Sequence, residues 1–146
     1  MGNPTRSRWN SNLNIVKKQM LQINQEMTDR VIEAMLVAAE DVATQILEKA
    51  DENVPEDEGD LRDSGRVERA RQIDKNTVEV EVVYGNERVN YAFFVEMNMP
   101  NPPEIKNYTR SGSGPFYLTR AGDEITGDPS IINKAFAKAM REMNGR

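Results

Sequence analysis

An apolar repeat with steps of three and four residues runs from about residue 12 to Pro55, and it constrains the fold more than any other feature of the sequence. Its members have the spacing of one face of an amphipathic helix: Val16, Met20, Ile23, Met27, Val31, Ala34, Ala38, Val42 and Ile46. No glycine or proline interrupts the repeat before Pro55, which would end a helix. The pattern predicts one helix of roughly forty residues, about 60 Å long at 1.5 Å per residue.

A helix of that length exceeds what a single domain of 146 residues can cover with its own core. We therefore expect that part of the apolar stripe meets another subunit, or that the helix breaks in two. Residues 1–11 contain two arginines and the only tryptophan, Trp9, and are interpreted as a flexible basic arm in which Trp9 contacts a neighbour. Residues 12–146 are predicted to form one domain.

Alternating valines in the middle of the chain predict a half-buried strand around Val78, Val80 and Val82. Asp74-Lys75-Asn76 supplies turn residues for a hairpin in front of it. The preceding segment, which carries Arg66, Arg69 and Arg71, alternates poorly and is predicted to be an exposed edge strand. The apolar run "YAFFVEM" at 91–97 is predicted to be a third strand.

The rest of the chain predicts a long loop and a C-terminal helix. Residues 97–115 are rich in Pro, Asn, Gly and Ser, and a loop of this length in a compact domain is usually functional or disordered. After it, Asp128 is predicted to cap a helix that has Pro129 in its first turn and ends near Gly145. The predicted fold class is α+β, with a long N-terminal helix and a C-terminal helix packed on a small, mainly antiparallel sheet.

The composition excludes several classes of chemistry. The chain has no cysteine and no histidine, which removes disulfides, thiolate zinc sites, cysteine nucleophiles and the usual general base near neutral pH. It has 24 acidic and 19 basic side chains, a formal net charge of −5, so there is no general attraction to nucleic acid. No apolar stretch is long enough to span a membrane, and no signal peptide is visible. We expect a soluble intracellular protein with few groups suited to catalysis and no cofactor.

The stretch "PEDEGDLRDSG" at 55–65 places the carboxylates of Asp57, Glu58, Asp60 and Asp63 close together. Their steps do not fit a calcium loop, whereas a magnesium site built with carboxylates from other elements stays open. We interpret the stretch as a structural turn. Pro55 ends the helix, Gly59 takes a positive φ, and Asp60 caps a short helical turn with Leu61 pointing inward.

Two further groups of charged residues have alternative interpretations. The arginines at 66, 69 and 71 are interleaved with Glu68 and are interpreted as a solvated or intersubunit face, with contact to phosphates as the alternative. Glu96 ends an apolar run, and it is either a buried partner for Arg62 or Arg120 or a solvated carboxylate.

The order of these motifs resembles the neck and tail-completion proteins of tailed bacteriophages, the minor tail-component family of lambda-like phages. Members read Pro, then Thr-Gly-x-Leu-x-x-Ser, later Tyr-Ala-x-x-Val-Glu-x-Gly, and later Pro-Phe-Leu. The matched motif residues, with Asp60 inside the first motif, are Pro55, Gly59, Asp60, Leu61, Arg62, Ser64, Tyr91, Ala92, Val95, Glu96, Pro115 and Phe116. The resemblance covers about residues 13–142. The chain departs from the pattern at three positions: Glu58 replaces Thr, Asn98 replaces Gly, and Tyr117 separates Phe116 from Leu118.

The resemblance implies a structural virion protein that forms a closed ring of roughly six or twelve copies at the head–tail junction. The ring would join the head-closure or connector ring to the tail terminator or tail tube, and genomic DNA would pass through it without specific binding. The expected location is the neck and tail of the virion, and the host cytoplasm during assembly. Expected core residues are Leu61, Tyr91, Phe93, Val95 and Phe116. Expected interface residues are Trp9, Met99, Tyr108, Arg110, Arg66, Arg69 and Arg71.

Two other function classes remain as hypotheses. The first is a DNA-binding accessory protein that uses the Arg66, Arg69 and Arg71 strand. The second is a carboxylate–metal hydrolase built on Asp57, Asp60 and Asp63.

Overall fold

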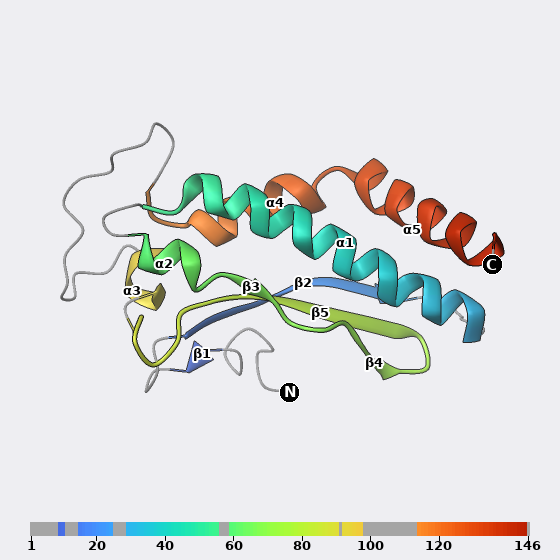
Figure 1. The fold of residues 1–146 in the computed structure, drawn as a ribbon, viewed down its shortest axis with the longest axis horizontal. Coiled ribbons are helices and arrows are strands. Elements are labelled where there is room, and N and C mark those ends of the chain that lie inside the picture. The colour runs from blue at the N-terminus through green and yellow to red at the C-terminus, as the bar shows by residue number, and fades with distance from the viewer. Residues whose placement is uncertain are drawn as a thin grey trace.

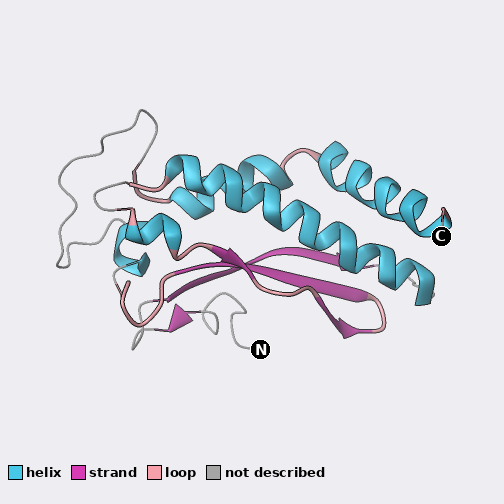
Figure 2. Ribbon diagram, viewed as in Figure 1, coloured by secondary structure: helices cyan, strands magenta, loops and turns pink. Residues whose placement is uncertain are grey.

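The computed structural model describes residues 9–10, 15–24, 29–55, 59–90, 92–97 and 114–145. Figures 1 and 2 show a layer of helices that covers one face of an antiparallel sheet. The fold is therefore α+β, as predicted. In chain order the elements are β1 (Trp9–Asn10), β2 (Ile15–Asn24), α1 (Asp29–Asn53), α2 (Asp60–Asp63), β3 (Arg66–Val67), β4 (Arg71–Asp74), β5 (Thr77–Tyr84), α3 (Ala92–Glu96), α4 (Tyr117–Thr126) and α5 (Pro129–Asn144).

Strand β5 is the centre of the sheet. It pairs with β2 on one side and with β3 and β4 on the other, and β1 adds to the outer edge of β2. The predicted strand around Val80 and the predicted hairpin before it are confirmed, with the backbone N–H of Asn76 donating to Asp74 Oδ1 at 2.8 Å in the turn. The strand is not half-buried as predicted, because seven of the eight residues of β5 are buried and these lie on both of its faces. The arginine segment also forms edge pairing as predicted, in two short strands, and all four residues of β4 are exposed.

The predicted forty-residue helix is wrong in its first half, because residues 15–24 form strand β2. The register between β2 and β5 shifts between Gln19 and Leu21, which is a β-bulge. A bulge adds one residue to the alternation of a strand, so Val16 and Ile23, which pair with Tyr84 and Val78, lie seven residues apart instead of six. Seven residues are about two turns of a helix, so this spacing imitates one face of a helix, whereas Met20 is the extra residue of the bulge.

Helix α1 keeps the second half of the predicted helix and forms the centre of the core. Its sequence is rich in alanine, the best helix former, and its buried side consists of Ala34, Met35, Ala38, Ala39, Val42, Ala43, Ile46 and Ala50. These residues pack in one cluster with Val78, Val80, Val82 and Tyr84 of β5. With 25 residues, α1 is about 37 Å long. A helix of this length does not require a neighbouring subunit to cover its apolar side.

Helix α5 begins and ends where the sequence predicts. The Asp128 side chain accepts a hydrogen bond from the Ser130 backbone N–H at 3.0 Å, Pro129 lies in the first turn, and Gly145 follows the last helical residue. Ala135 and Ala139 are buried on the side of α5 that packs toward α1. Within the described part of the chain, no helix is both long and apolar enough to cross a membrane.

Two segments after β5 differ from the prediction. The run at 91–97 contains helix α3 instead of the predicted third strand, and β2 is a strand of the sheet that was not predicted. A seven-residue apolar run fits a short strand and a single helical turn equally well. Residues 117–126 form helix α4, which was not predicted, and Tyr117, Leu118, Ala121 and Gly122 form its buried side.

The close packing of α5 on α1 can be tested by enlarging a small buried side chain of α5. Ala139 is buried, so we expect Ala139→Leu to lower the free energy of unfolding by about 1–3 kcal/mol through overpacking. Ala137 lies on the exposed side of the same helix, and Ala137→Leu is the matched control, with an expected change within about 0.5 kcal/mol. Urea denaturation of both variants measures the difference. Equal effects would contradict the packing.

Candidate functional site

The motif residues of the sequence meet at one end of the domain, where α2 and α3 lie near the C-terminal end of α1 and the start of α4 (Figure 1). Pro55 and Gly59 through Ser64 surround α2, whereas Ala92, Val95 and Glu96 belong to α3. Pro115 and Phe116 directly precede α4. Tyr91, Asp57, Glu58, Met99, Tyr108 and Arg110 lie outside the described residues. Trp9 lies in β1, which pairs with β2.

The turn after α1 differs from the prediction at one residue. Gly59 has φ 81°, as expected, and Leu61 is buried. Gly59 itself occupies the N-cap position and α2 begins at Asp60, with no side-chain hydrogen bond at the cap. The prediction that Asp60 caps this helix is therefore wrong, because the left-handed glycine starts the helix one residue earlier. Asp60 and Asp63 are both exposed, and the described residues contain no group of three side chains that could hold a metal ion.

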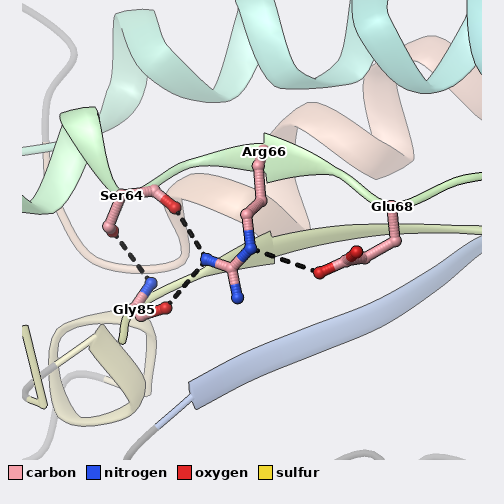
Figure 3. A network of polar contacts seen from close by, with 4 residues as sticks. All are labelled: Ser64, Arg66, Glu68 and Gly85. Atoms are coloured by element: carbon pink, nitrogen blue, oxygen red, sulfur yellow. Dashed lines mark hydrogen bonds and ion pairs between the residues drawn. The ribbon is translucent and has the colours of Figure 1, made fainter. Parts of the chain in front are cut away.

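Ser64 ties this turn to the end of β5 (Figure 3). Its buried hydroxyl donates to the carbonyl of Leu61 at 2.6 Å and accepts from the backbone N–H of Gly85 at 2.8 Å. Arg66 Nη1 donates to the carbonyls of Ser64 and Gly85, at 3.0 and 2.9 Å, and its Nε lies 3.2 Å from Glu68 Oε1. The Arg66 guanidinium is thus engaged in joining β3 to the chain that leaves β5.

Gly65 allows Tyr84 to lie directly against the backbone of this turn. A Cβ atom on Gly65 would be 2.6 Å from Tyr84 Cε1 and 3.0 Å from Leu47 Cδ1. The Tyr84 ring is fully buried and also meets the ring of Tyr117 edge-on, with centroids 5.0 Å apart. Only glycine fits at position 65 without displacing this ring.

The two tyrosines connect four elements through their hydroxyl groups. Tyr84 donates to Asp51 Oδ1 of α1 at 2.6 Å, and Tyr117 at the start of α4 donates to the carbonyl of Ala92 in α3 at 3.1 Å. Burial, and then the hydrogen bond to Asp51, raise the pKa of Tyr84 far above its usual value. The phenol therefore stays protonated and remains a hydrogen-bond donor.

Glu96 caps helix α4 from another element. Its side chain is buried, at 1% exposure. The carboxylate accepts hydrogen bonds from the backbone N–H groups of Leu118 and Thr119, both at 2.9 Å, and from the Thr119 hydroxyl. The first N–H groups of a helix have no partner within the helix, and negative charge is favoured there. Glu96 is thus buried, as one of the two interpretations predicted. The groups that donate hydrogen bonds to its carboxylate belong to α4.

Phe116 does not enter the core as expected. It is 41% exposed, and its backbone lies in the left-handed region with φ 57°. The backbone N–H of Phe116 donates to the carbonyl of Glu96 at 2.9 Å, which fixes this conformation next to α3. Met97, the last described residue of the α3 segment, is also exposed. Two apolar side chains are therefore exposed at the two ends of the segment 98–113.

The return of the chain from this segment is attached to α1. The backbone N–H of Gly114 donates to the carbonyl of Asn53 at 2.9 Å, and Asn53 Nδ2 donates to the carbonyl of Tyr117 at 3.3 Å. Together with the contacts of Glu96, these bonds fix residues 97 and 114 to one end of the helical layer.

The arginine segment has mixed charge. Arg71 pairs with the buried Glu79, with Nη2 and Oε2 3.2 Å apart. A cavity of about 300 Å³ at this edge of the sheet is lined by Glu68, Arg69, Arg71, Glu79, Val80 and Glu81. Three carboxylates and two guanidinium groups face it, so its local charge does not favour phosphate.

Sequence reasoning missed Gly65, Tyr84 and Asp51. Each is defined by a contact between elements distant in the sequence, and no short motif marks them. Glu96 was singled out correctly, but its partners depend on α4, which was not predicted.

A substitution at Gly65 tests the contact with Tyr84. We expect Gly65→Ala to lower the free energy of unfolding by about 1–3 kcal/mol, because the buried ring has to move. In the control Gly145→Ala, the nearest atom to the new Cβ is Arg141 O at 3.6 Å and φ is −83°, so stability should stay the same or rise. Thermal denaturation followed by circular dichroism compares them. A neutral Gly65→Ala would refute the close contact.

The capping role of Glu96 is tested by Glu96→Gln. The amide keeps one acceptor but turns an N–H₂ group toward a backbone donor, and we expect a loss of about 1–3 kcal/mol in the free energy of unfolding. Glu142→Gln, an exposed change on α5, should shift stability by less than about 0.5 kcal/mol. Urea denaturation measures both variants. A Glu96→Gln protein as stable as this control would contradict the cap.

Comparisons with known proteins give one match. A family model with the description "Bacteriophage HK97-gp10, putative tail-component" matches residues 17–97, more than half of the chain. Searches of the curated proteins and of the solved structures found no match. The matched range includes the sheet from β2 onward, α1, the turn around α2 and the Glu96 segment, and it confirms the resemblance to tailed-phage tail components. The chain belongs to the HK97-gp10-like family.

Proposed function

We propose that this tail component forms a ring at the neck of the virion, between the head-closure or connector ring and the tail terminator or tail tube. The ring borders the channel through which the genome passes. The observation that carries this proposal is the family match over residues 17–97. The role is structural and not catalytic.

The motif end of the domain supports a role in contacting neighbouring rings. Glu96, Asn53 and Gly114 attach both ends of the segment 98–113 to the helical layer. The chain on both sides of residues 98–113 is thus fixed to the core. Met97 and Phe116 lie at its two ends, and both are exposed apolar residues. An exposed apolar side chain contributes favourable free energy when a neighbouring protein buries it.

The conformation of Phe116 adds to this argument. A bulky residue at φ 57° is strained by about 1–2 kcal/mol, and such strain persists where the surroundings impose it. The contacts of Glu96 impose it here. We assign Phe116 as an apolar anchor that enters the adjacent ring, with Met99, Tyr108 and Arg110 as further contacts.

The net charge of −5 suits a channel that DNA must pass without being retained. The alternative function, DNA binding through the Arg66, Arg69 and Arg71 strand, is not favoured. Two of these three guanidinium groups make hydrogen bonds or ion pairs within the chain.

The test is complementation of a phage that lacks this gene, followed by cryo-electron microscopy of the particles. Phe116→Asn removes the apolar side chain and keeps a residue that accepts the left-handed conformation, so the domain should fold. We expect filled heads without attached tails. The matched control is Ile73→Asn, at an exposed apolar residue of β4, and it should give complete virions.

Particles complemented with the wild-type gene should show density for this domain repeated around the tail axis at the neck. A neck without such density would overturn the proposed location. Normal virions from Phe116→Asn would overturn the role of Phe116 alone.

A further inference from the structure

The exposed side of α1 is acidic. The helix carries seven acidic and two basic side chains, a net charge of −5. A row of residues with exposed or partly exposed side chains follows one face at steps of three and four, and we call it the acidic face: Glu33, Val37, Glu40, Thr44 and Glu48. Val37 is 44% exposed and lies near its middle. The face thus has an apolar centre with carboxylates on both sides.

The exposed side of α5 has the opposite charge. This helix carries three basic and one acidic side chain, a net charge of +2 in a chain whose total is −5. Its exposed row, called the basic face, consists of Lys134, Lys138 and Arg141 at steps of four and three, with Ala137 next to Lys138. Ala137 is an exposed apolar residue among the three cations. The composition of this face complements that of the acidic face.

Within one chain, each of the two faces lies on the side of its helix that is not packed in the core. Helices α1 and α5 pack against each other in the helical layer (Figure 1). Ala135 and Ala139 are buried on the packed side of α5, and the basic face lies on its other side. Likewise the acidic face of α1 excludes Ala38, Ala39 and Val42, which are fully buried. Each face is therefore open to a second molecule.

We infer that the basic face of α5 in one copy of this chain docks on the acidic face of α1 in the next copy. The contact is heterologous, because it joins two different surfaces. Repetition of one heterologous contact builds a ring when its rotation closes. An apolar centre with a charged rim is the usual anatomy of a protein interface, and opposite potentials speed and orient association. The inference rests on the proposed ring and names the surfaces that form it.

Disulfide trapping tests the contact directly, because the chain has no cysteine of its own. One preparation carries Val37→Cys and a second carries Ala137→Cys, so that every charge of both faces is retained. We expect mixed-disulfide dimers to form at least about tenfold faster than for the control pair Val37→Cys with Lys75→Cys. Lys75 is exposed in the hairpin turn between β4 and β5, away from both faces. A chain with both Val37→Cys and Ala137→Cys should give a ladder of oligomers.

Charge reversal tests the electrostatic part. Lys134→Glu, Lys138→Glu and Arg141→Glu, added together to the Ala137→Cys chain, should reduce trapping to the control rate. Adding Glu33→Lys, Glu40→Lys and Glu48→Lys to the Val37→Cys chain should restore it. Circular dichroism establishes that each variant is folded. Raising the salt concentration should slow trapping of the native faces.

A trapping rate equal to that of the control pair overturns the inference, whatever the oligomeric state of the wild-type chain. Faster trapping between two Val37→Cys chains overturns it in favour of a symmetric contact. Control-rate trapping together with binding to duplex DNA that the charge reversal of α5 abolishes assigns the basic face to nucleic acid. If the neck shows this ring but trapping stays at the control rate, the contact fails and the proposed function stands. If trapping is fast but the neck shows no ring, the contact between the two faces stands and the proposed function fails.

Discussion

A buried carboxylate at the end of α3 joins this helix to the start of α4. Glu96 accepts hydrogen bonds from the first N–H groups of α4, while its own carbonyl accepts from Phe116. A helix N-terminus packed inside a protein needs such a partner, because an unpaired buried N–H group is costly. Phe116 at the N-cap position makes no side-chain hydrogen bond. The N–H groups at the start of α4 are therefore paired by a residue some twenty positions earlier.

The parts of the fold that local chemistry determines could be predicted from the sequence. Alternating valines specify β5, turn residues specify the hairpin before it, and Asp128, Pro129 and Gly145 specify the bounds of α5. Prediction failed where a distant contact determines the structure. The bulge between Gln19 and Leu21 places Val16 and Ile23 seven residues apart, the spacing of about two helical turns. Helix α4 starts without a local capping signal because Glu96 supplies the cap.

In the candidate site, too, features set by local sequence could be predicted and features set by distant contacts could not. The turn residues Gly59 and Leu61 have the backbone conformation and burial that their sequence context predicts. Phe116 was expected inside because it is aromatic, yet its left-handed backbone turns it outward. The pair of Gly65 and Tyr84 carries no signal in the sequence, since the need for glycine arises only when β5 and α1 bring the ring against the turn. A resemblance to a family can locate such a region, but only the structure explains each residue in it.

The attachment of residues 97 and 114 has a consequence for how this domain can change over evolutionary time. Asn53, Glu96 and Tyr117 hold the two ends of the intervening segment through contacts with the helical layer. Lengthening the connection between two fixed points costs only about 0.6 kcal/mol for each doubling of its length. Insertions or deletions between residues 97 and 114 should therefore change the free energy of folding little. Selection for a new partner could act on it almost independently of selection for stability, and one domain could serve phages with different tails.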